Sequence, residues 1–312
     1  MSIRTDLALE AHEVCREEAE EDAKIDGVEA ETEKDESITV TKIKINNKNG
    51  EDALGKPIGR YITIESPNLK YSVSEYEKTC IKISETLISL IGETGDLPIL
   101  VAGLGNTEIT PDALGPAVMS KLIITRHMKK HLKDSFGSDF SNVCAIAPGV
   151  LGTTGIETAS IIKGVCEQIN PAVIIAIDAL AARSADRIST TIQISDTGIQ
   201  PGAGVGNRRD GLNRETLGVK VIAVGVPTVV DASTIARDSL DAALEQIHSD
   251  TLSDKEKEKI IENTLSKNIA KLVVTPKDID LVIERAAKTV ANGINLALHK
   301  NLTFDDIESF VG

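Results

Sequence analysis

The sequence is poor in aromatic side chains, in cysteine and in positive charge. Among 312 residues there is no tryptophan, three are tyrosine and four are phenylalanine, whereas 41% are hydrophobic. A core must therefore consist mainly of Ile, Val, Leu and Ala, and the hydrophobic share is typical of a globular protein. With 34 Lys and Arg against 48 Asp and Glu, the net charge is −14, which argues against binding to nucleic acid.

Long hydrophobic runs are missing as well. No apolar stretch approaches the roughly 20 residues that a membrane-spanning helix needs, and the N-terminal MSIRTDLALEAHE has no apolar signal core. The four cysteines are scattered and form no C-x-x-C pair, which is typical of reduced thiols in a cytosol. We therefore expect a cytoplasmic protein with no membrane partner.

Common cofactor and nucleophile motifs are also absent. A dinucleotide-binding G-x-G-x-x-G would need glycine where Glu108 stands, and there is no G-x-x-x-x-G-K-[ST] phosphate loop. There is no G-x-S-x-G turn of a serine hydrolase either. The glycine loop 103–107 is thus not a phosphate cradle, and we expect no cofactor.

Histidine and cysteine give little sign of a metal site or of a thiol nucleophile. His127 and His131 are four residues apart on an expected helix, but the basic context HMKKHLK favours a solvated face. Cys144 lies in an apolar run with no histidine nearby, which favours a buried, inert thiol. We therefore expect no metal ion.

Apolar strands alternate with helical patterns through most of the chain. This pattern predicts an α/β protein with a mostly parallel twisted sheet and helices on both faces. An N-terminal β-hairpin-like region of two half-buried strands precedes it, at 37–45 and 60–66. The expected later strands are 97–105, 142–149, 171–180, 190–195 (a candidate antiparallel strand) and 219–227, and the expected helices are 74–91, 115–132, 155–170, 231–247 and 275–298.

Residues 10–36 are dominated by Glu and Asp and predict a solvated helix or a mobile acidic arm. The last long helix is expected to begin with Thr275 as N-cap and Pro276 at its first position. No internal repeat divides the chain. We therefore expect one α/β domain over residues 7–312.

Two aspartates stand where ligands bind in open α/β sheets, beyond the carboxyl ends of strands. Asp112 follows the strand near residue 100, and Asp178 directly follows the apolar run AVIIAI, where we expect its strand to leave the sheet. Burial should raise the pKa of Asp178, and two carboxyls in one such crevice tend to share a proton. The ionised partner can activate water and the protonated one can polarise a carbonyl and protonate the leaving amine.

Aspartates in such places also serve as helix caps, and the pattern by itself leaves both interpretations open for Asp112 and Asp178. Asp231, in PTVVDAST, has a similar position but is typical of an ordinary N-cap.

Several long motifs resemble those of the germination protease of spore-forming Gram-positive bacteria. They are IRTDLALE, GLGN, TPDALGP, PGVLGTTGIET, IIAIDALAARS, QISDTGIQPGAGVGN and VIAVGVPTVVDA, and they extend to about residue 235. The resemblance implies a fold similar to that of the hydrogenase-maturation endopeptidases. It also implies an atypical aspartic-type endopeptidase, with Asp112 and Asp178 as its catalytic pair.

The same resemblance implies an activity and a life history. The family is made as a zymogen, forms tetramers and starts the degradation of small acid-soluble spore proteins in the germinating spore, so a homotetramer in the spore core is expected. Family substrates are cut after an acidic residue in a Thr-Glu-apolar-Ala-x-Glu type of segment, which TDLALE imitates. We therefore expect self-cleavage between Asp6 and Leu7, releasing a pro-segment of residues 1–6 that is shorter than the resemblance suggests.

Asn106 and Gly105 lie near Asp112 in sequence and are candidates to support it or to hold the polarised carbonyl oxygen. Two other functions are weighed against this one. A metal-probing maturation peptidase of the same fold would need a further ligand such as histidine near the strand ends. A non-enzymatic binding module would be favoured by loss of either aspartate, and both are present.

Overall fold

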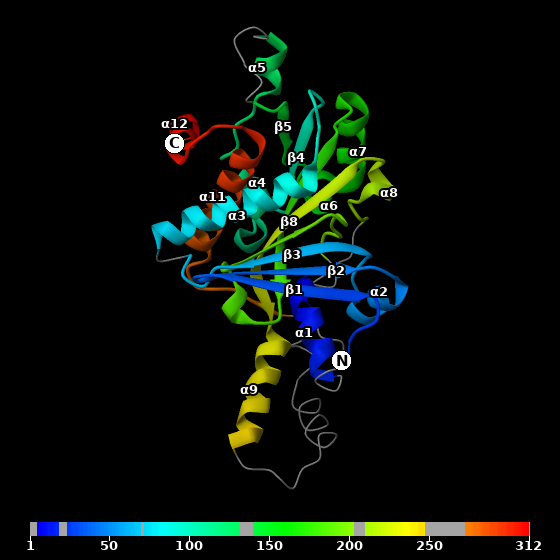
Figure 1. Cartoon of the computed structure of the whole chain (residues 1–312), viewed down its shortest axis with the longest axis vertical. Coiled ribbons are helices and arrows are strands. Elements are labelled where there is room, and N and C mark those ends of the chain that lie inside the picture. Colours follow the sequence, from blue (N-terminus) through cyan, green and yellow to red (C-terminus); the bar gives the residue numbers. More distant parts are fainter. Residues whose placement is uncertain are drawn as a thin grey trace.

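The computed structural model describes residues 5–18, 24–69, 72–131, 140–202, 210–246 and 272–311. Its nine strands form one mixed sheet in the order β1-β2-β3-β7-β8-β6-β4-β5, with β9 paired to the end of β8 (Figure 1). Strands β8, β6, β4 and β5 are parallel, whereas β1, β2, β3 and β7 join them by antiparallel pairs. The bounds are β1 (Val28–Asp35), β2 (Ile38–Ile45), β3 (Gly59–Glu65), β4 (Ile99–Gly103), β5 (Val143–Ile146), β6 (Val173–Ala182), β7 (Thr191–Ser195), β8 (Lys220–Asp231) and β9 (Val273–Val274).

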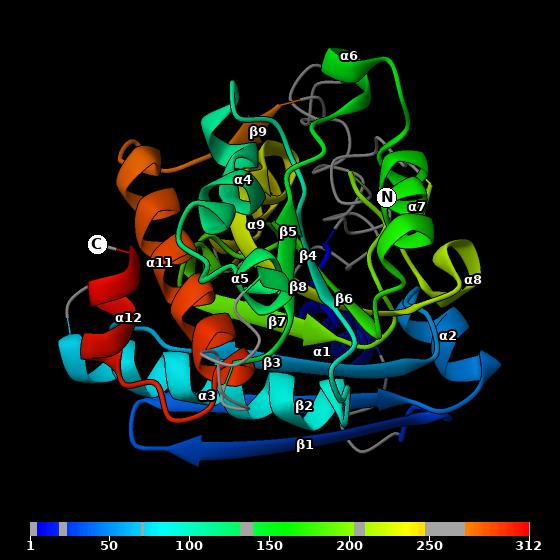
Figure 2. The same ribbon diagram turned by 90° about the horizontal axis from the view of Figure 1, so that it is seen from above.

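Helices cover both faces of this sheet, as Figure 2 shows from above. Helices α3, α4 and α11 lie on one face, and α7 and α8 lie on the other. The α-helices are α1 (Ala8–Glu18), α2 (Lys48–Leu54), α3 (Val73–Ile91), α4 (Leu114–Met119), α5 (Arg126–His131), α6 (Leu151–Thr154), α7 (Thr158–Ile169), α8 (Arg214–Leu217), α9 (Ala232–Gln246), α11 (Ile279–Leu298) and α12 (Phe304–Val311). The α/β class with helices on both faces is thus confirmed.

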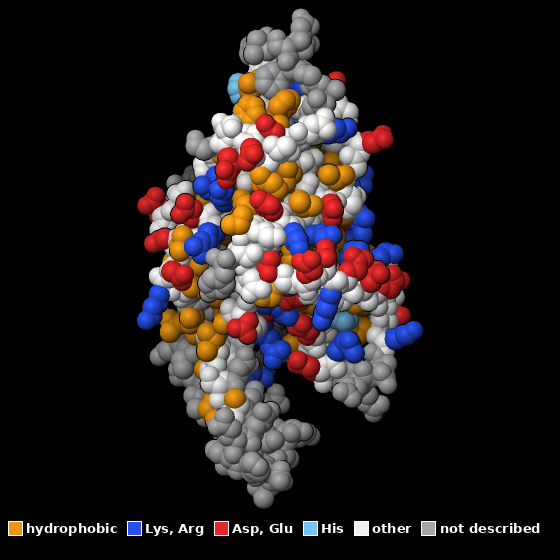
Figure 3. All heavy atoms as spheres, turned by 60° about the vertical axis from the view of Figure 1, so that its left-hand side comes forward, with side chains coloured by type: hydrophobic (Ala, Val, Ile, Leu, Met, Phe, Trp, Pro, Cys, Tyr) orange, Lys and Arg blue, Asp and Glu red, His pale blue; other side chains and the backbone are white. Residues whose placement is uncertain are grey.

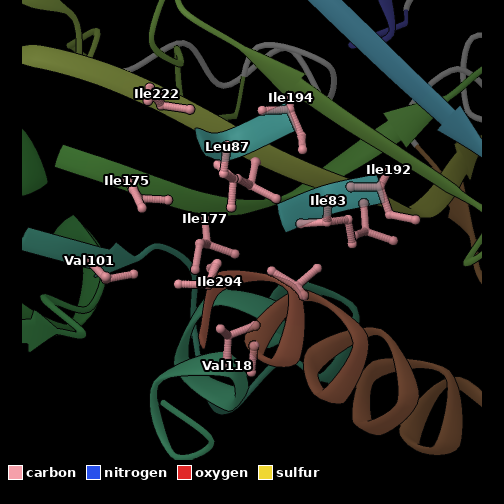
Figure 4. Packing of buried hydrophobic residues seen from close by; sticks show 14 of the residues in the cluster. Ile83, Leu87, Val101, Val118, Ile175, Ile177, Ile192, Ile194, Ile222 and Ile294 are labelled. Atoms are coloured by element: carbon pink, nitrogen blue, oxygen red, sulfur yellow. The ribbon is translucent and has the colours of Figure 1, made fainter. Parts of the chain in front are cut away.

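The largest core lies between the sheet and helices α3, α4 and α11. Figure 4 shows its aliphatic side chains pointing toward one another, Ile83 and Leu87 from α3 and Ile294 from α11 against Ile175 and Ile177 of β6. The period-two alternation of β6 places Ile175 and Ile177 on this face and its even-numbered neighbours on the other. The opposite face is therefore the one on which Asp178 lies.

Strand β6 differs from the expectation in a way that matters for the site. It does not leave the sheet at Asp178 but continues to Ala182, paired with β8 along its whole length. Its other neighbour, β4, ends where Gly103 pairs with Ile177. Asp178 therefore lies inside a strand, one residue beyond the point at which β4 stops covering it.

Two helix predictions were wrong in detail. The expected helix 115–132 is interrupted between α4 and α5, because Asn295 of α11 hydrogen bonds to the N–H of Ile123 and to the carbonyl oxygen of Lys121. Thr275 is not an N-cap, since its hydroxyl donates to the carbonyl oxygen of Thr228 and α11 begins at Ile279.

The acidic region 10–36 also differs from a solvated arm in the parts that the structure describes. Residues 28–35 form β1, an exposed strand paired along its length with β2. Helix α1 lies on the face of the sheet that carries Asp178, and Ala8 and Leu9 pack on Ile43, Ile45 and Tyr61. The chain near the expected cleavage point is therefore held against the body of the protein.

Figure 3 shows one face of the molecule, on which acidic and basic side chains are interspersed and apolar side chains form small separate groups. None of the helices in the described ranges is long and apolar enough to span a bilayer.

Candidate active site

Asp112 is held by a tight loop that follows β4 and folds back on itself. The N–H of Asn106 donates to Oδ2 of Asp112 at 2.8 Å and to its carbonyl oxygen at 3.2 Å. Gly105 has φ +111°, and a Cβ on it would lie 1.9 Å from that carbonyl oxygen. Only glycine fits this close approach of two backbone segments. In the described contacts, the N–H of Asn106 and the close backbone approach at Gly105 therefore hold Asp112 in its loop.

Asp178 is buried in β6, with 6% of its surface exposed, and its Oδ1 accepts a hydrogen bond from the N–H of Ala179 at 3.0 Å. Burial raises its pKa well above the usual range, and the nearby charges of Asp112 and Asp6 raise it further. Burial also raises the pKa of Asp112, against the hydrogen bond from Asn106. The two candidate carboxyls are therefore close enough to interact, and Asp178 is the one that favours its protonated form.

The segment that contains the Asp6–Leu7 bond lies beside this pair. The N–H of Asp6 donates to the carbonyl oxygen of Ala181 at 2.9 Å, and the N–H of Ala181 donates to Oδ2 of Asp6 at 2.9 Å. Leu7 is fully buried and packs on Leu180, Ala182 and other apolar side chains around the end of β6. The structure thus brings together both candidate aspartates and the expected cleavage point.

Two polar side chains that sequence reasoning missed contact the same segment. Lys56 Nζ donates to the carbonyl oxygens of Thr5 and Asp6, each at 3.0 Å. Gln193 of β7 donates through Nε2 to the carbonyl oxygen of Asp6 at 3.1 Å. Lys56 lies in none of the motifs named above. Gln193 is the first residue of QISDTGIQPGAGVGN, so the resemblance pointed to its segment but gave it no role, and nothing in the local pattern reports its contact with Asp6.

Glu10 was also missed, because it belongs to a strongly acidic run that was expected to face water. It is 1% exposed, and its carboxylate accepts hydrogen bonds from the N–H groups of Arg183 at 2.7 Å and Ser184 at 3.0 Å. Arg187 Nη1 lies 3.2 Å from Glu10 Oε1, and its guanidinium also binds Glu13. These hydrogen bonds and ion pairs fix α1 on the end of β6. The same residues line a pocket of about 380 Å³.

The other candidates lie in ordinary structural settings. Oδ1 of Asp231 accepts a hydrogen bond from the N–H of Ser233 at 2.8 Å, as an N-cap side chain does. Burial raises the pKa of the Cys144 thiol, which disfavours the reactive thiolate. His127 is exposed on α5, and among the residues that the structure describes no group of three or more His, Cys, Asp or Glu could hold a metal ion.

Comparison with known proteins gives consistent matches over nearly the whole chain. The family model described as germination protease (Peptidase_A25) matches residues 8–250 and 249–311. The germination protease of Caldanaerobacter subterraneus is 47% identical, over 97% of this chain and 96% of its own. That of Clostridium tetani is 45% identical over 100% of both chains, and that of Bacillus cereus is 39% identical over 99% of this chain and 97% of its own.

Among solved structures, the NiFe hydrogenase maturation protease HycI from Thermococcus kodakarensis is 16% identical, with a TM-score of 0.32 over 67% of this chain and 98% of that chain. The family model covers far more than half of the chain, and curated relatives at 39–47% identity span almost all of it. The chain therefore belongs to the germination protease family of peptidases.

Proposed function

We propose that this protein is an endopeptidase of spore germination that first cuts its own chain between Asp6 and Leu7. One observation carries the proposal: the Asp6–Leu7 segment is docked on the end of β6, near Asp178, whose pKa is raised by burial and further by the charges of Asp112 and Asp6. A peptide bond that is bound beside two interacting carboxyls is the arrangement that acid–base hydrolysis requires.

In the proposed mechanism the two carboxyls of Asp112 and Asp178 share one proton. The ionised carboxylate takes a proton from water, and the water oxygen bonds to the carbonyl carbon of Asp6. The C–N bond to Leu7 then breaks, and the carboxylic acid gives its proton to the leaving nitrogen. Asn106 and Gly105 support this chemistry by holding Asp112 in its loop.

The pH dependence follows from the direction of the pKa shifts. Because the pKa of Asp178 is raised, the singly protonated pair persists to higher pH than it would for exposed aspartates. As pH rises through the raised pKa, the pair loses its proton and cleavage should stop. Mildly acidic pH should therefore favour self-processing.

After residues 1–6 are removed, small acid-soluble spore proteins are the proposed substrates. The resemblance of TDLALE to the substrates of the family supports this proposal, because the same crevice would receive either segment. The spore core as location and a homotetramer as assembly are proposed on the family resemblance alone.

Intact mass over time, for purified protein shifted to mildly acidic pH, tests the proposed function. Wild type should lose residues 1–6, whereas Asp112→Asn and Asp178→Asn should not. Asp231→Asn is a matched control, since it makes the same change at the end of the neighbouring strand and asparagine also caps helices. Cleavage in both aspartate variants would refute the paired mechanism, and a wild type that stays intact and cuts no added spore protein would favour a binding module.

A further inference from the structure

One row of residues crosses the sheet beneath the docked segment. In the strand register, Asp178 of β6 is the partner of Gly225 in β8, and Gly225 is the partner of Gln193 in β7. Cross-strand partners share a face of the sheet, so Asp178 and Gln193 project from the same face with a glycine between them. Their backbones are about 10 Å apart, two strand spacings, which leaves room for one peptide group between the two side chains.

The Asp6 residue is bound by Ala181, near the end of β6, on one side and by Gln193 of β7 on the other. Its N–H and its side chain pair with Ala181 on the β6 side, whereas its carbonyl oxygen is turned toward Gln193 and Lys56. The N–H of Ala8 donates to Oε1 of Gln193 at 2.7 Å, which turns the Nε2 end of the amide toward Asp6. The amide of Gln193 thus grips the chain on both sides of Leu7.

Lys56 reaches the same oxygen from the turn that follows α2. Gly55 ends that helix in the left-handed conformation with φ 63°, and the next residue enters the crevice. Burial lowers the pKa of Lys56, while the negative charges of Asp6 and Glu10 oppose that shift. A donor in such a partly buried setting interacts with developing negative charge more strongly than it would in bulk water.

We propose that Lys56 and Gln193 are catalytic residues that hold the oxyanion formed at the Asp6 carbonyl during cleavage. This inference rests on the proposed self-cleavage. As water adds to the carbonyl carbon, the electron pair of the C=O bond moves onto the oxygen, and Nζ and Nε2 donate hydrogen bonds to it. When the C–N bond breaks, the pair returns to form the new carboxyl group, and Lys56 and Gln193 keep their protons.

This division of labour separates two tasks in the site. The aspartate pair moves protons between water and the leaving nitrogen, while Lys56 and Gln193 stabilise the negative charge on the carbonyl oxygen. The N–H of Asn106 is already bonded to Asp112, so its contact serves the carboxylate rather than the carbonyl of the docked segment.

The test compares self-cleavage of full-length wild type with that of Lys56→Met and Gln193→Met, by intact mass at mildly acidic pH. Methionine has the chain length of glutamine and is one atom shorter than lysine, and it removes the donor in both cases. In Gln193→Met the acceptor for the N–H of Ala8 is lost as well, which the docking measurement below takes into account. Lys48→Met is the matched control, because that lysine is exposed at the start of α2 and pairs only with Glu51 and Asp52 in the described contacts. Hydrogen exchange of residues 8–18 measures the docked fraction, so that each rate can be corrected for loss of docking.

We expect each corrected rate to fall about 100-fold, the usual effect of removing one oxyanion donor, with Lys48→Met unchanged. Corrected rates within threefold of wild type would show that the two residues only clamp the segment, which overturns the inference. If Asp112→Asn is then still inactive, the proposed function survives that result. Failure of the wild type to cut at Asp6–Leu7 would instead refute the self-processing itself, and the inference with it.

Discussion

Replacing Glu10 by alanine should release α1 from the body of the protein. In the docked state the substitution leaves the N–H groups of Arg183 and Ser184 without their acceptor, and Arg187 without one of its carboxylates. An unpaired buried donor costs about 1–3 kcal/mol, so the two amides together cost about 2–6 kcal/mol. At about 1.4 kcal/mol for each tenfold change, the ratio of docked to undocked segment should fall by roughly 30-fold to 10⁴-fold.

Hydrogen exchange of residues 8–18 measures this ratio directly, in an Asp112→Asn background in which residues 1–6 should stay attached, so that every variant is compared uncleaved. The faster exchange should be confined to α1, while the strands of the sheet keep their protection. Glu17→Ala is the matched control on the same helix, because its carboxylate is exposed and lies 3.5 Å from Arg183 Nη1, a contact of about 0–1 kcal/mol. Unchanged protection in Glu10→Ala, or an equal loss in Glu17→Ala, would refute the assignment of Glu10 as the anchor.

Three further changes test the aspartates and the segment. Asp178→Asn should raise the melting temperature at pH 7, because it removes a buried charge. Since the pKa of Asp178 is raised in the folded protein, the free energy of unfolding of the wild type should fall by about 1.4 kcal/mol per pH unit from about pH 3.9 up to the raised pKa. Equal wild-type melting temperatures across that range would contradict a raised pKa. Gly105→Ala should abolish self-cleavage, measured by intact mass, because the added Cβ would lie 1.9 Å from the Asp112 carbonyl oxygen. Gly164→Ala is the control and should cut at the normal rate, since a Cβ there would have no neighbouring atom within 4 Å. Leu7→Ala should weaken docking of the segment by about 2–5 kcal/mol as a buried cavity opens, seen as faster hydrogen exchange in α1; exchange as slow as in wild type would argue against the packing seen at the end of β6.

The sequence predicted most of the fold because its elements carry strong local signals. Apolar runs predicted the parallel strands, and helical spacing predicted a helix at 74–91, where α3 spans Val73–Ile91 with Ser72 as its N-cap. The errors occur where a distant contact overrides local pattern. Asn295 interrupts the helix expected at 115–132 from 172 residues away, and nothing in the local sequence reports that contact.

Charge composition misled the interpretation of residues 10–36 for a similar reason. Glu10 belongs to a run of acidic side chains, and such runs usually face water. Its burial depends on the N–H groups of Arg183 and Ser184 at the end of β6, which are far away in the chain. A buried carboxylate is tolerated where it is paired, and the pairing partners become visible only in the folded protein.

The candidate site divides in the same way between what sequence can and cannot predict. Asp112 follows β4 and Asp178 follows the apolar run that begins β6, so local pattern alone placed both near the carboxyl ends of neighbouring strands, although β6 continues beyond Asp178. Gln193 has no such signal, because its place opposite Asp178 depends on β7 lying antiparallel beside β8, a pairing between segments about 30 residues apart. A shift of β7 by one residue would turn Gln193 to the opposite face, where Ile192 and Ile194 now pack against α3 (Figure 4). The burial of those two isoleucines therefore fixes the register that brings Gln193 to the Asp6 carbonyl, so the hydrophobic core on one face of the sheet determines the polar arrangement on the other.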